Sequence, residues 1–231
     1  MREIVFDTET TGLNPREDRI IEIGGLELVN RFPSGRTFHV YLNPQGRSVH
    51  PEAQAVHGIS DADLADKPAF HEIAGEFLEF VAGAKLVAHN ATFDMGFINA
   101  ELARIGEAAI ASDRVIDTLM LARRKHPMGP NSLDALCRRY GVDNSRRTFH
   151  GALLDAELLA EVYAELMGGR QAALGLEVSV AMESGMAQES ADEAFVFSRE
   201  RRPLLTDAER EAHEALVARL GEIALWKKLA S

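Results

Sequence analysis

Apolar residues in the first 42 positions fall into three short runs that are typical of β-strands. The runs cover residues 3–6, 20–29 and 37–42, and Gly, Pro and Asn residues with turn propensity separate them. Because the connections are short, we expect these strands to be antiparallel neighbours in one sheet. Ile4, Val5 and Phe6 are consecutive apolar residues, which predicts that the first strand is buried.

From residue 70 onward, apolar residues recur at helical spacing. One stripe predicts a helix over residues 70–81, and a short apolar strand follows at 85–88. The pattern then predicts a helix at 93–105, a strand at 114–117, and helices at 133–140 and 152–167. Together these elements predict an α/β domain over residues 1–170, with a mixed sheet flanked by helices.

The composition changes after residue 170. Residues 177–197 contain five acidic residues and no Lys or Arg, which predicts a flexible acidic linker within residues 171–203. In residues 204–231, Thr206 and Glu209 have the spacing of a capping box, and an apolar stripe follows them. We therefore expect a C-terminal helical tail. The stripe consists of Ala212, Leu216, Leu220, Ile223 and Trp226.

Composition and charge narrow the class of protein. The net charge of −11 argues against a protein held to nucleic acid by a broad basic surface, although local basic patches remain compatible with it. Cys137 is the only cysteine, so the chain cannot form an internal disulfide. The start of the chain does not resemble a signal peptide, and no apolar run approaches the roughly 20 residues of a membrane span. These features predict a cytoplasmic protein with no membrane partner.

Two carboxylates follow the apolar part of the first strand. Asp7 and Glu9 are separated by one residue, and alternate side chains of a strand point to the same face. The two acids should therefore converge at the end of a core strand, where their like charges repel each other. Such a pair requires a positive charge nearby.

Two further acids belong to apolar helical stripes. Asp94 lies three residues before Phe97, and Asp155 lies three residues before Leu158. A buried carboxylate without a partner is strongly unfavourable or changes its protonation. These two acids, together with the pair on the first strand, need a common counter-charge, and a divalent metal would supply it.

The types of ligand favour particular metals. The sequence has no Cys or His pair at zinc-binding spacing, whereas carboxylate oxygens are preferred by hard cations such as Mg²⁺ and Mn²⁺. Clusters of this kind commonly hold two ions about 4 Å apart, which contact the attacking and leaving oxygens of a phosphodiester. We therefore expect two divalent ions, Mg²⁺ or Mn²⁺, held by Asp7, Glu9, Asp94 and Asp155.

His150 completes the candidate set. On a continuous helix it would lie about 140° away from Asp155, so we expect it in the loop before that helix, facing the same metals. There a neutral imidazole could take the proton of an attacking water. Each residue also has a structural interpretation: Asp7 and Glu9 could form a solvated turn, and Asp94 could cap its helix. We interpret Asp117 as structural.

Three motifs connect these residues to a known family. The segments DTETTGL (7–13), HNATFD (89–94) and HGALLD (150–155) resemble, in order and spacing, the three motifs of the DEDD exonucleases in the histidine-containing branch. More closely, IIEIGGLELVNR, VHGISD, NSLDALCRRYGVDNS and RRTFHGALLDAELLAEVY resemble the epsilon subunits of bacterial DNA polymerase III, which are proofreading exonucleases. This resemblance covers nearly all of residues 1–170.

The resemblance implies a ribonuclease H-like fold and removal of 3′-terminal nucleotides from DNA as 5′-monophosphates. It makes the four acids metal ligands and His150 the general base, and it suggests that Leu13, His57 and Phe93 contact the terminal nucleotide. The expected substrate is a single-stranded or frayed 3′ end. Stacking on an aromatic residue is insensitive to base identity, which suits proofreading. The three substrate residues could instead serve packing.

The tail predicts attachment to partners. An isolated helix cannot bury the stripe of Leu216, Leu220, Ile223 and Trp226, and the resemblance implies that the alpha subunit of DNA polymerase III binds it. A second segment resembles the short peptides that bind the bacterial sliding clamp, although a frayed helix end is an equally good interpretation. Its residues are Gln171, Leu174 and Leu176.

Three other functions remain open. An exoribonuclease of the same family would share every catalytic residue, but the tail after residue 170 favours a polymerase subunit. A non-catalytic scaffold that binds the polymerase is disfavoured by the complete set of acids and histidine. A ribonuclease H-like endonuclease would share the metal chemistry, and the HGALLD motif disfavours it.

Overall fold

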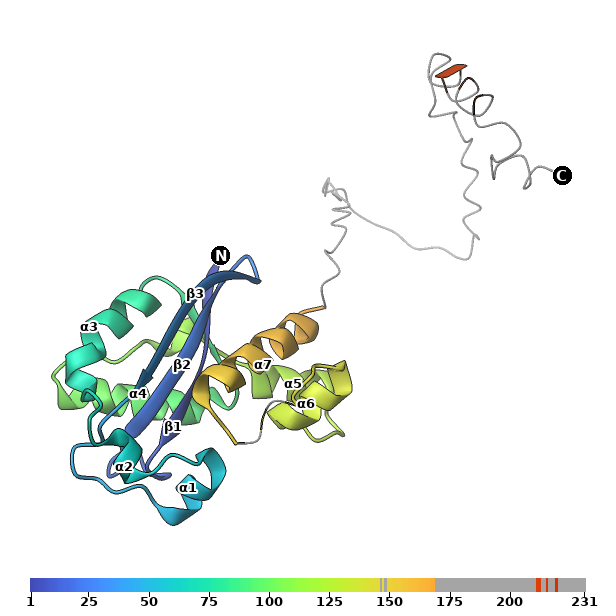
Figure 1. The fold of residues 1–231 in the computed structure, drawn as a ribbon. Helices are drawn as coiled ribbons and strands as arrows, with labels where there is room; N and C mark the ends of the chain where they lie inside the picture. Colours follow the sequence, from blue (N-terminus) through green and yellow to red (C-terminus); the bar gives the residue numbers. More distant parts are fainter. Residues whose placement is uncertain (146, 148, 169–210, 213–214, 216–218, 220–231) are drawn as a thin grey trace, which may run out of the picture. The chain divides into compact units, whose positions relative to one another are not determined.

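The computed structural model describes residues 1–145, 147, 149–168, 211–212, 215 and 219. Up to residue 168 the described chain forms a five-stranded sheet with helices on both faces (Figure 1). The strands are β1 (Arg2–Thr10), β2 (Ile20–Val29), β3 (Phe32–Tyr41), β4 (Lys85–Ala88) and β5 (Val115–Asp117). The helices are α1 (Pro51–His57), α2 (Asp61–Leu64), α3 (Phe70–Val81), α4 (Ala91–Arg104), α5 (Thr118–Lys125), α6 (Leu133–Tyr140) and α7 (Ala152–Leu166), with a 3₁₀ turn, η1, at Ser112–Arg114.

The strand order β3-β2-β1-β4-β5 places β1 at the centre of the sheet. Strands β1, β2 and β3 pair antiparallel, whereas β4 pairs parallel with both β1 and β5. The mixed sheet and the antiparallel N-terminal strands predicted from the sequence are confirmed. Because β1 and β4 are parallel, their carboxyl ends lie at the same edge, and the segments that follow them can share a site there.

Helices cover both faces of the central strand, which explains its continuous apolar sequence. Ile4 and Phe6 pack with α3 and α4 on one face, and Val5 packs with α7 on the other. A third cluster of apolar side chains joins α7 to α5 and α6. In Figure 1, α3 and α4 lie on one side of the sheet and α5, α6 and α7 on the other.

Most predicted elements are present, with shifts at their ends. The helix at 70–81 and the strand at 85–88 have the predicted bounds, and α4 begins two residues earlier than predicted. Strand β3 begins five residues earlier than predicted. Residues 32–37 are exposed at the edge of the sheet, so their pattern of apolar positions did not indicate a strand. The helices α1, α2 and α5 were not predicted, and α1 and α2 are too short to show a clear helical period.

The predicted linker and tail fall largely beyond what the structure describes. Of the tail, Glu211, Ala212, Ala215 and Arg219 are helical and exposed. The partner-binding candidates Gln171, Leu174, Leu176, Leu216, Leu220, Ile223 and Trp226 lie outside the described residues, so their roles stay predictions. Within the described chain, no helix is both long enough and apolar enough to span a membrane.

Candidate active site

The end of β1 presents two acids on one face of the sheet. Val5 packs on the α7 side, and because side chains alternate along a strand, Asp7 and Glu9 point to that side as well. On the neighbouring strand β2, Gly24 lies opposite Asp7 and Glu22 lies opposite Glu9. The predicted convergence of the two carboxylates therefore has a simple cause in the pleat of β1.

Helix α4 brings in the third acid. Asp94 lies in the first turn of α4, which follows the parallel strand β4. Its Oδ1 accepts hydrogen bonds from the backbone N of Thr8 (3.1 Å) and from the Thr8 hydroxyl (2.8 Å). Asp94 is 2% exposed, and these bonds hold it against the residue between Asp7 and Glu9. It does not cap its own helix.

Helix α7 brings in the fourth acid because a glycine lets it approach the sheet. A Cβ atom placed on Gly24 would lie 2.1 Å from the backbone N of Leu153, so only glycine fits at this position. The first turn of α7 therefore packs directly against the backbone of β2, opposite Asp7. Asp155 lies in this turn and is 2% exposed.

The loop before α7 carries the histidine and an arginine that the sequence analysis did not single out. His150 lies in this loop, as predicted, and its backbone N donates to the carbonyl of Val56 on α1 (3.2 Å). The guanidinium of Arg147 donates to both carboxylate oxygens of Asp155 and to Nδ1 of His150 (2.7 Å). It also donates to Asp134 on α6 (2.9 Å).

All eight predicted catalytic and substrate residues line one cavity of about 410 Å³. They are Asp7, Glu9, Leu13, His57, Phe93, Asp94, His150 and Asp155. The structure thus brings together residues that β1, α1, α4, α7 and two loops supply. Further lining residues, which the sequence analysis did not assign, come from the strand ends and from α6. They include His89, Asn90, Ser132, Leu133, Asp134 and Arg147.

One wall of the cavity suits a nucleotide base. Leu13 is 80% exposed, and the ring of Phe93 is held by contact with Phe97 at a centroid distance of 4.9 Å. His57 is buried, and its Nδ1 accepts a hydrogen bond from the backbone N of Ile59 (3.1 Å). Burial lowers the pKa of His57, so its ring is neutral, with Nε2 protonated. Nε2 is buried and makes no hydrogen bond to another described residue.

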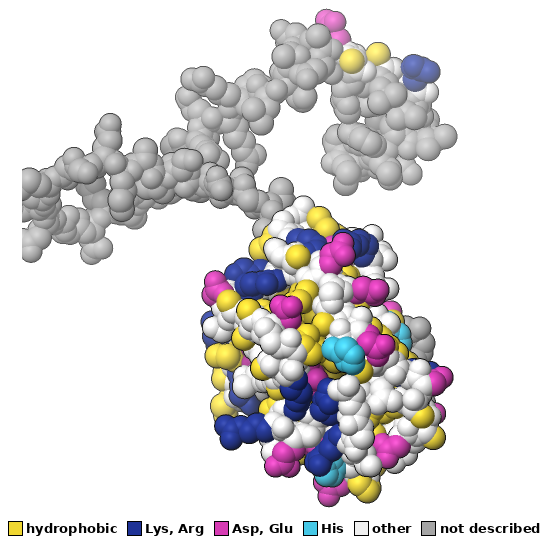
Figure 2. All heavy atoms as spheres, turned by 90° about the vertical axis from the view of Figure 1, so that its left-hand side faces the viewer, with side chains coloured by type: hydrophobic (Ala, Val, Ile, Leu, Met, Phe, Trp, Pro, Cys, Tyr) yellow, Lys and Arg dark blue, Asp and Glu magenta, His cyan; other side chains and the backbone are white. Residues whose placement is uncertain are grey.

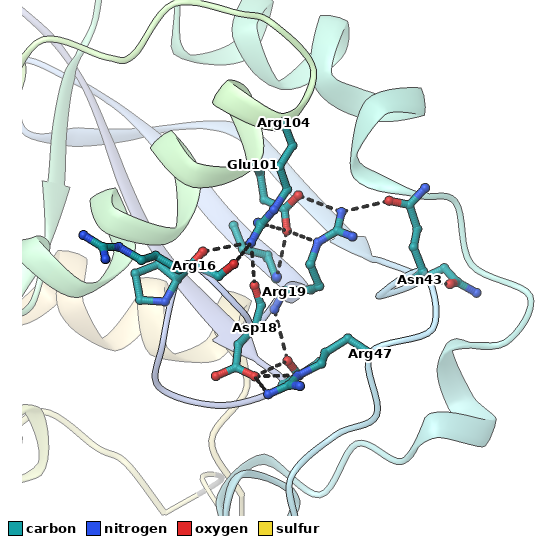
Figure 3. Close-up of polar contacts among 11 residues, drawn as sticks. Arg16, Asp18, Arg19, Asn43, Arg47, Glu101 and Arg104 are labelled. Carbon is teal, nitrogen blue, oxygen red and sulfur yellow. Dashed lines mark hydrogen bonds and ion pairs between the residues drawn. The ribbon is translucent and has the colours of Figure 1, made fainter.

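An ion-pair network fixes the loop that carries Leu13. Lys and Arg side chains gather on one face of this acidic protein (Figure 2), and the network in Figure 3 contains several arginines. Buried Asp18 accepts from Arg47 (2.9 Å) and from the backbone of Asn14 (2.9 Å). Arg104 of α4 donates to the carbonyl oxygens of residues 15, 16 and 18. These contacts fix the conformation of the loop, and Leu13 is exposed on it.

Burial and mutual repulsion raise the pKa values of three acids. The pKa of Glu9 is raised to about 8 by burial first and then by repulsion from Asp155 and other acids. Burial also raises the pKa of Asp94 to about 7, although the hydrogen bonds from Thr8 oppose this. The pKa of Asp7 is raised well above its ordinary value by burial and by its acidic neighbours. Among the described residues, none of these three carboxylates pairs with a cation, and the charge of Arg147 only partly opposes the rise for Asp7 and Glu9.

Asp155 behaves differently. Burial alone would raise its pKa, but the interactions of the carboxylate with His150 and Arg147 outweigh burial and hold the pKa below its ordinary value. The donor atoms of Glu9, His150 and Asp155 lie within 4.8 Å of one another, while Asp7 and Asp94 stand outside this tighter group. A cluster of carboxylate oxygens with too little positive charge around it fits a hard divalent cation.

Comparison with known proteins identifies the family. The sequence model of the exonuclease family RNase_T matches residues 4–163. The chain belongs to this exonuclease family. It is 46% identical to the DNA polymerase III subunit epsilon of Escherichia coli K12, over 98% of this chain and 97% of that protein. It is 54% identical to the subunit of the same name from Rickettsia felis, over 75% of this chain and 77% of that protein.

Solved exonuclease structures share the fold. Exonuclease X in complex with 5′-overhanging duplex DNA superposes with a TM-score of 0.56 and 28% identity, covering 72% of this chain and 90% of that chain. The zinc-bound complex of Escherichia coli exonuclease I with single-stranded DNA gives a TM-score of 0.64 at 20% identity, covering 74% and 41%. The predicted ribonuclease H-like fold and the 3′–5′ exonuclease activity of the epsilon type are confirmed.

Sequence reasoning missed two residues on which the site depends. Glycines inside a strand often mark a close approach of another backbone, so Gly24 in β2 could have been noticed. Arg147 gives no comparable signal, because an arginine in a loop is ordinary and its ion pairs appear only in the fold. Asp117, interpreted as structural, caps α5 by accepting from the backbone N of Leu119 (2.8 Å).

Proposed function

We propose that this exonuclease proofreads DNA, removing mispaired 3′-terminal nucleotides by hydrolysis that requires two divalent ions, Mg²⁺ or Mn²⁺. The observation that carries the proposal is the single cavity in which four carboxylates face a histidine and an apolar wall. The raised pKa values of Glu9 and Asp94 support binding of a cation there, because each acid is buried with too little positive charge around it.

Each acid has a distinct support that suits a metal ligand. Asp7 and Glu9 come from the rigid central strand, Asp94 is oriented by Thr8, and Asp155 is fixed by the contact of α7 with β2. When bound, the ions would stabilise the charge that develops on the phosphodiester and lower the pKa of a coordinated water. The four side chains contribute negative charge and fixed oxygen positions, which is why their replacement should abolish hydrolysis.

His150 is suited to move the proton. Its side chain is 46% exposed at the mouth of the cavity, and Asp155 lies 3.4 Å from its Nδ1. In the proposed reaction, the neutral imidazole accepts a proton from the attacking water as the new P–O bond forms. The bond between phosphorus and the 3′ oxygen breaks, and the leaving oxygen takes a proton from solvent, which releases a 5′-monophosphate and leaves a new 3′ hydroxyl on the shortened strand.

The apolar wall explains which ends are cut. Leu13 would act as a wedge and Phe93 as a stacking surface, and His57, which lines the same cavity, would contact the terminal nucleotide. None of these contacts requires a particular base. Discrimination then follows from fraying, because a mispaired end is single-stranded more often than a paired end.

The partner is proposed to be the alpha subunit of DNA polymerase III, acting in the bacterial cytoplasm. The curated relatives named as epsilon subunits of this polymerase support this proposal. The predicted contacts are the apolar stripe at Leu216, Leu220, Ile223 and Trp226, and for the sliding clamp Gln171, Leu174 and Leu176. A linker between nuclease and tail would keep the nuclease at high local concentration near the primer end.

A hydrolysis assay tests the catalytic proposal. The purified chain with Mg²⁺ is given single-stranded DNA and RNA of the same sequence with a 3′ label, together with duplexes that have a paired or a mispaired 3′ end. We expect 5′-mononucleotides from DNA, with mispaired ends cut faster than paired ends. Preference for RNA would support an exoribonuclease, and internal cuts would indicate an endonuclease.

Truncation tests the partner proposal. A chain that ends at residue 180 should keep activity on free single strands but lose stable co-elution with the alpha subunit in size-exclusion chromatography. Undiminished co-elution would contradict binding through the tail. For the clamp, replacing Gln171 and Leu174 with Ala should weaken binding to the purified clamp, and unchanged binding would exclude that segment as the contact.

A further inference from the structure

Arg147 is the one cation that contacts the acidic cluster directly among the described residues. Its side chain is 7% exposed, and the Asp155 side chain that it contacts is 3% exposed. It donates through Nε and Nη2 to the two oxygens of Asp155, a two-point geometry that gives a strong charge-assisted pair. The other three acids of the cavity have no comparable cationic partner in the part of the chain that the structure describes.

This pair conflicts with metal binding at the same carboxylate. Both oxygens of Asp155 point toward the guanidinium, and a cation bound to these oxygens would also face the fixed positive charge of Arg147 at short range. The arginine and a divalent ion are therefore alternative partners of Asp155. Because the side chain of Arg147 is long, it can leave this carboxylate without any movement of α7.

The same guanidinium restrains His150. Nη2 of Arg147 lies 2.7 Å from Nδ1 of the imidazole, and a guanidinium can only donate. Nδ1 must therefore be the acceptor, so the hydrogen of the neutral ring lies on Nε2. As long as this contact persists, the lone pair of His150 is occupied by Arg147 and cannot accept a proton from water.

Asp134 offers the arginine a second position. It lies in the first turn of α6, and its Oδ1 already accepts from Nη1 of Arg147 at 2.9 Å. Asn144 donates to the same carboxylate (3.1 Å) and holds it in place. The Asp134 side chain is 42% exposed, so pairing with it is compatible with partial release of Arg147 to solvent.

We propose that Arg147 is a positioning residue that competes with the divalent metal for Asp155 and, when the metal displaces it toward Asp134, releases His150 for catalysis. The inference rests on the proposed function and adds to it an ordered activation of the site. Arg147 keeps the acidic cluster and its loop folded when no metal is bound. His150 is then free to act as the base only when the metal is bound.

Calorimetric titration of Mn²⁺ into the full chain, after removal of metal with EDTA, tests the competition. Arg147→Met should bind Mn²⁺ about 10-fold more tightly than the wild type, because no cation has to be displaced. Arg147→Lys should lie between them, since it keeps the charge but loses the two-point contact. Arg138→Met, a matched change at an exposed arginine on α6, should have no effect. Unchanged or weaker binding by Arg147→Met would overturn the proposal.

A double-mutant cycle tests the role of Asp134. Asp134→Asn should weaken Mn²⁺ binding about 3-fold in the wild type, because the displaced arginine loses its second partner, and should have little effect in Arg147→Met. Equal effects in both backgrounds would exclude Asp134 as the second position. This comparison remains informative even if one single variant is less stable than the wild type.

Nitrogen NMR of the histidine rings tests the release of the base. In the EDTA-treated wild type, the Nδ1 signal of His150 should be that of an unprotonated nitrogen that accepts a hydrogen bond. Addition of Mg²⁺ should shift this signal in the wild type and much less in Arg147→Met. A signal unaffected by Mg²⁺ in the wild type would contradict release. These measurements use no substrate, so failure of the nuclease assay would leave them interpretable, and failure here would leave the nuclease assignment intact.

Discussion

Asp94 and Asp155 are similar in position but differ in electrostatics. Each lies in the first turn of a helix, each is 2% exposed, and both line the same cavity. Burial, with a smaller contribution from Asp117, raises the pKa of Asp94 to about 7, whereas the pKa of Asp155 is held below its ordinary value. The two aspartates therefore carry different charge at neutral pH when no metal is bound.

The two carboxylates have different partners, which act on their pKa values in different degrees. Asp94 accepts two hydrogen bonds from Thr8, which is neutral, and these only partly offset burial. Asp155 is contacted by His150 and by the guanidinium of Arg147, which together more than offset burial. Asp94 thus has no cationic partner among the described residues. Asp155 is neutralised by Arg147, which belongs to the loop before α7.

The largest expected effect is the loss of hydrolysis when either side loses a carboxylate. Asp7→Ala and Asp155→Ala should each reduce Mg²⁺-dependent nuclease activity by about 10³-fold or more, because each removes a metal ligand. Release of a 3′ label measures this effect, and circular dichroism verifies that the fold is retained. If a folded variant kept wild-type activity, the assignment of the acids as metal ligands would be wrong.

His150→Ala should cost about 10²-fold in rate at neutral pH, because the attacking water loses its proton acceptor. The pH profile of activity should therefore differ between the wild type and the variant. The measurement is the rate of mononucleotide release across a pH series at saturating Mg²⁺. An unchanged rate and pH profile would remove His150 from the mechanism.

Gly24→Ala should separate α7 from the sheet and so move Asp155. The added Cβ would meet backbone atoms of α7 at 2.1 to 2.4 Å, and we expect a loss of about 3 kcal/mol in the free energy of unfolding together with reduced activity. Gly25→Ala is the control, since its Cβ would make ordinary contacts at 3.4 to 3.6 Å. Denaturation in urea compares the two variants, and equal stabilities would contradict the close approach.

The two aspartates should respond to amide substitution with opposite signs in EDTA at pH 8. Asp94→Asn should stabilise the chain by about 1 kcal/mol, because it removes a buried charge without a counter-ion, and Asp155→Asn should destabilise it by about 2 kcal/mol by leaving Arg147 partly unpaired. Changes of the same sign would contradict the electrostatic difference drawn between them. Urea denaturation measures both variants.

The pH dependence of the free energy of unfolding tests the same difference between Asp94 and Asp155. The folded chain binds the Asp94 proton more tightly than the unfolded chain, so wild-type stability without metal should fall as pH rises from about 4 to 7. The stabilising effect of Asp155 is present above its unfolded pKa and is lost only as pH falls below that range. Asp94→Asn should therefore flatten the decline between pH 4 and 7, and Asp155→Asn should not.

Local pattern was sufficient for much of the fold and of the site. The period of apolar residues predicted α3 and β4 at their observed bounds, and the spacing of Asp7 and Glu9 on a strand predicted their convergence. The motifs identified the family before the fold was considered. Short helices such as α2 and the exposed start of β3 were missed, because neither shows enough apolar residues to define a period.

By itself, the sequence determined the type of protein and predicted the five catalytic candidates and a divalent metal, since these depend on residue types at fixed local spacing. Only the tertiary structure decided how the four acids meet and which of them has a counter-charge. Gly24 matters because α7 packs on β2, and Arg147 matters because its loop turns back over Asp155. Gly24 and α7 are distant along the chain, and Arg147 reaches Asp155 only because its loop folds back. No local period of apolar residues encodes either contact.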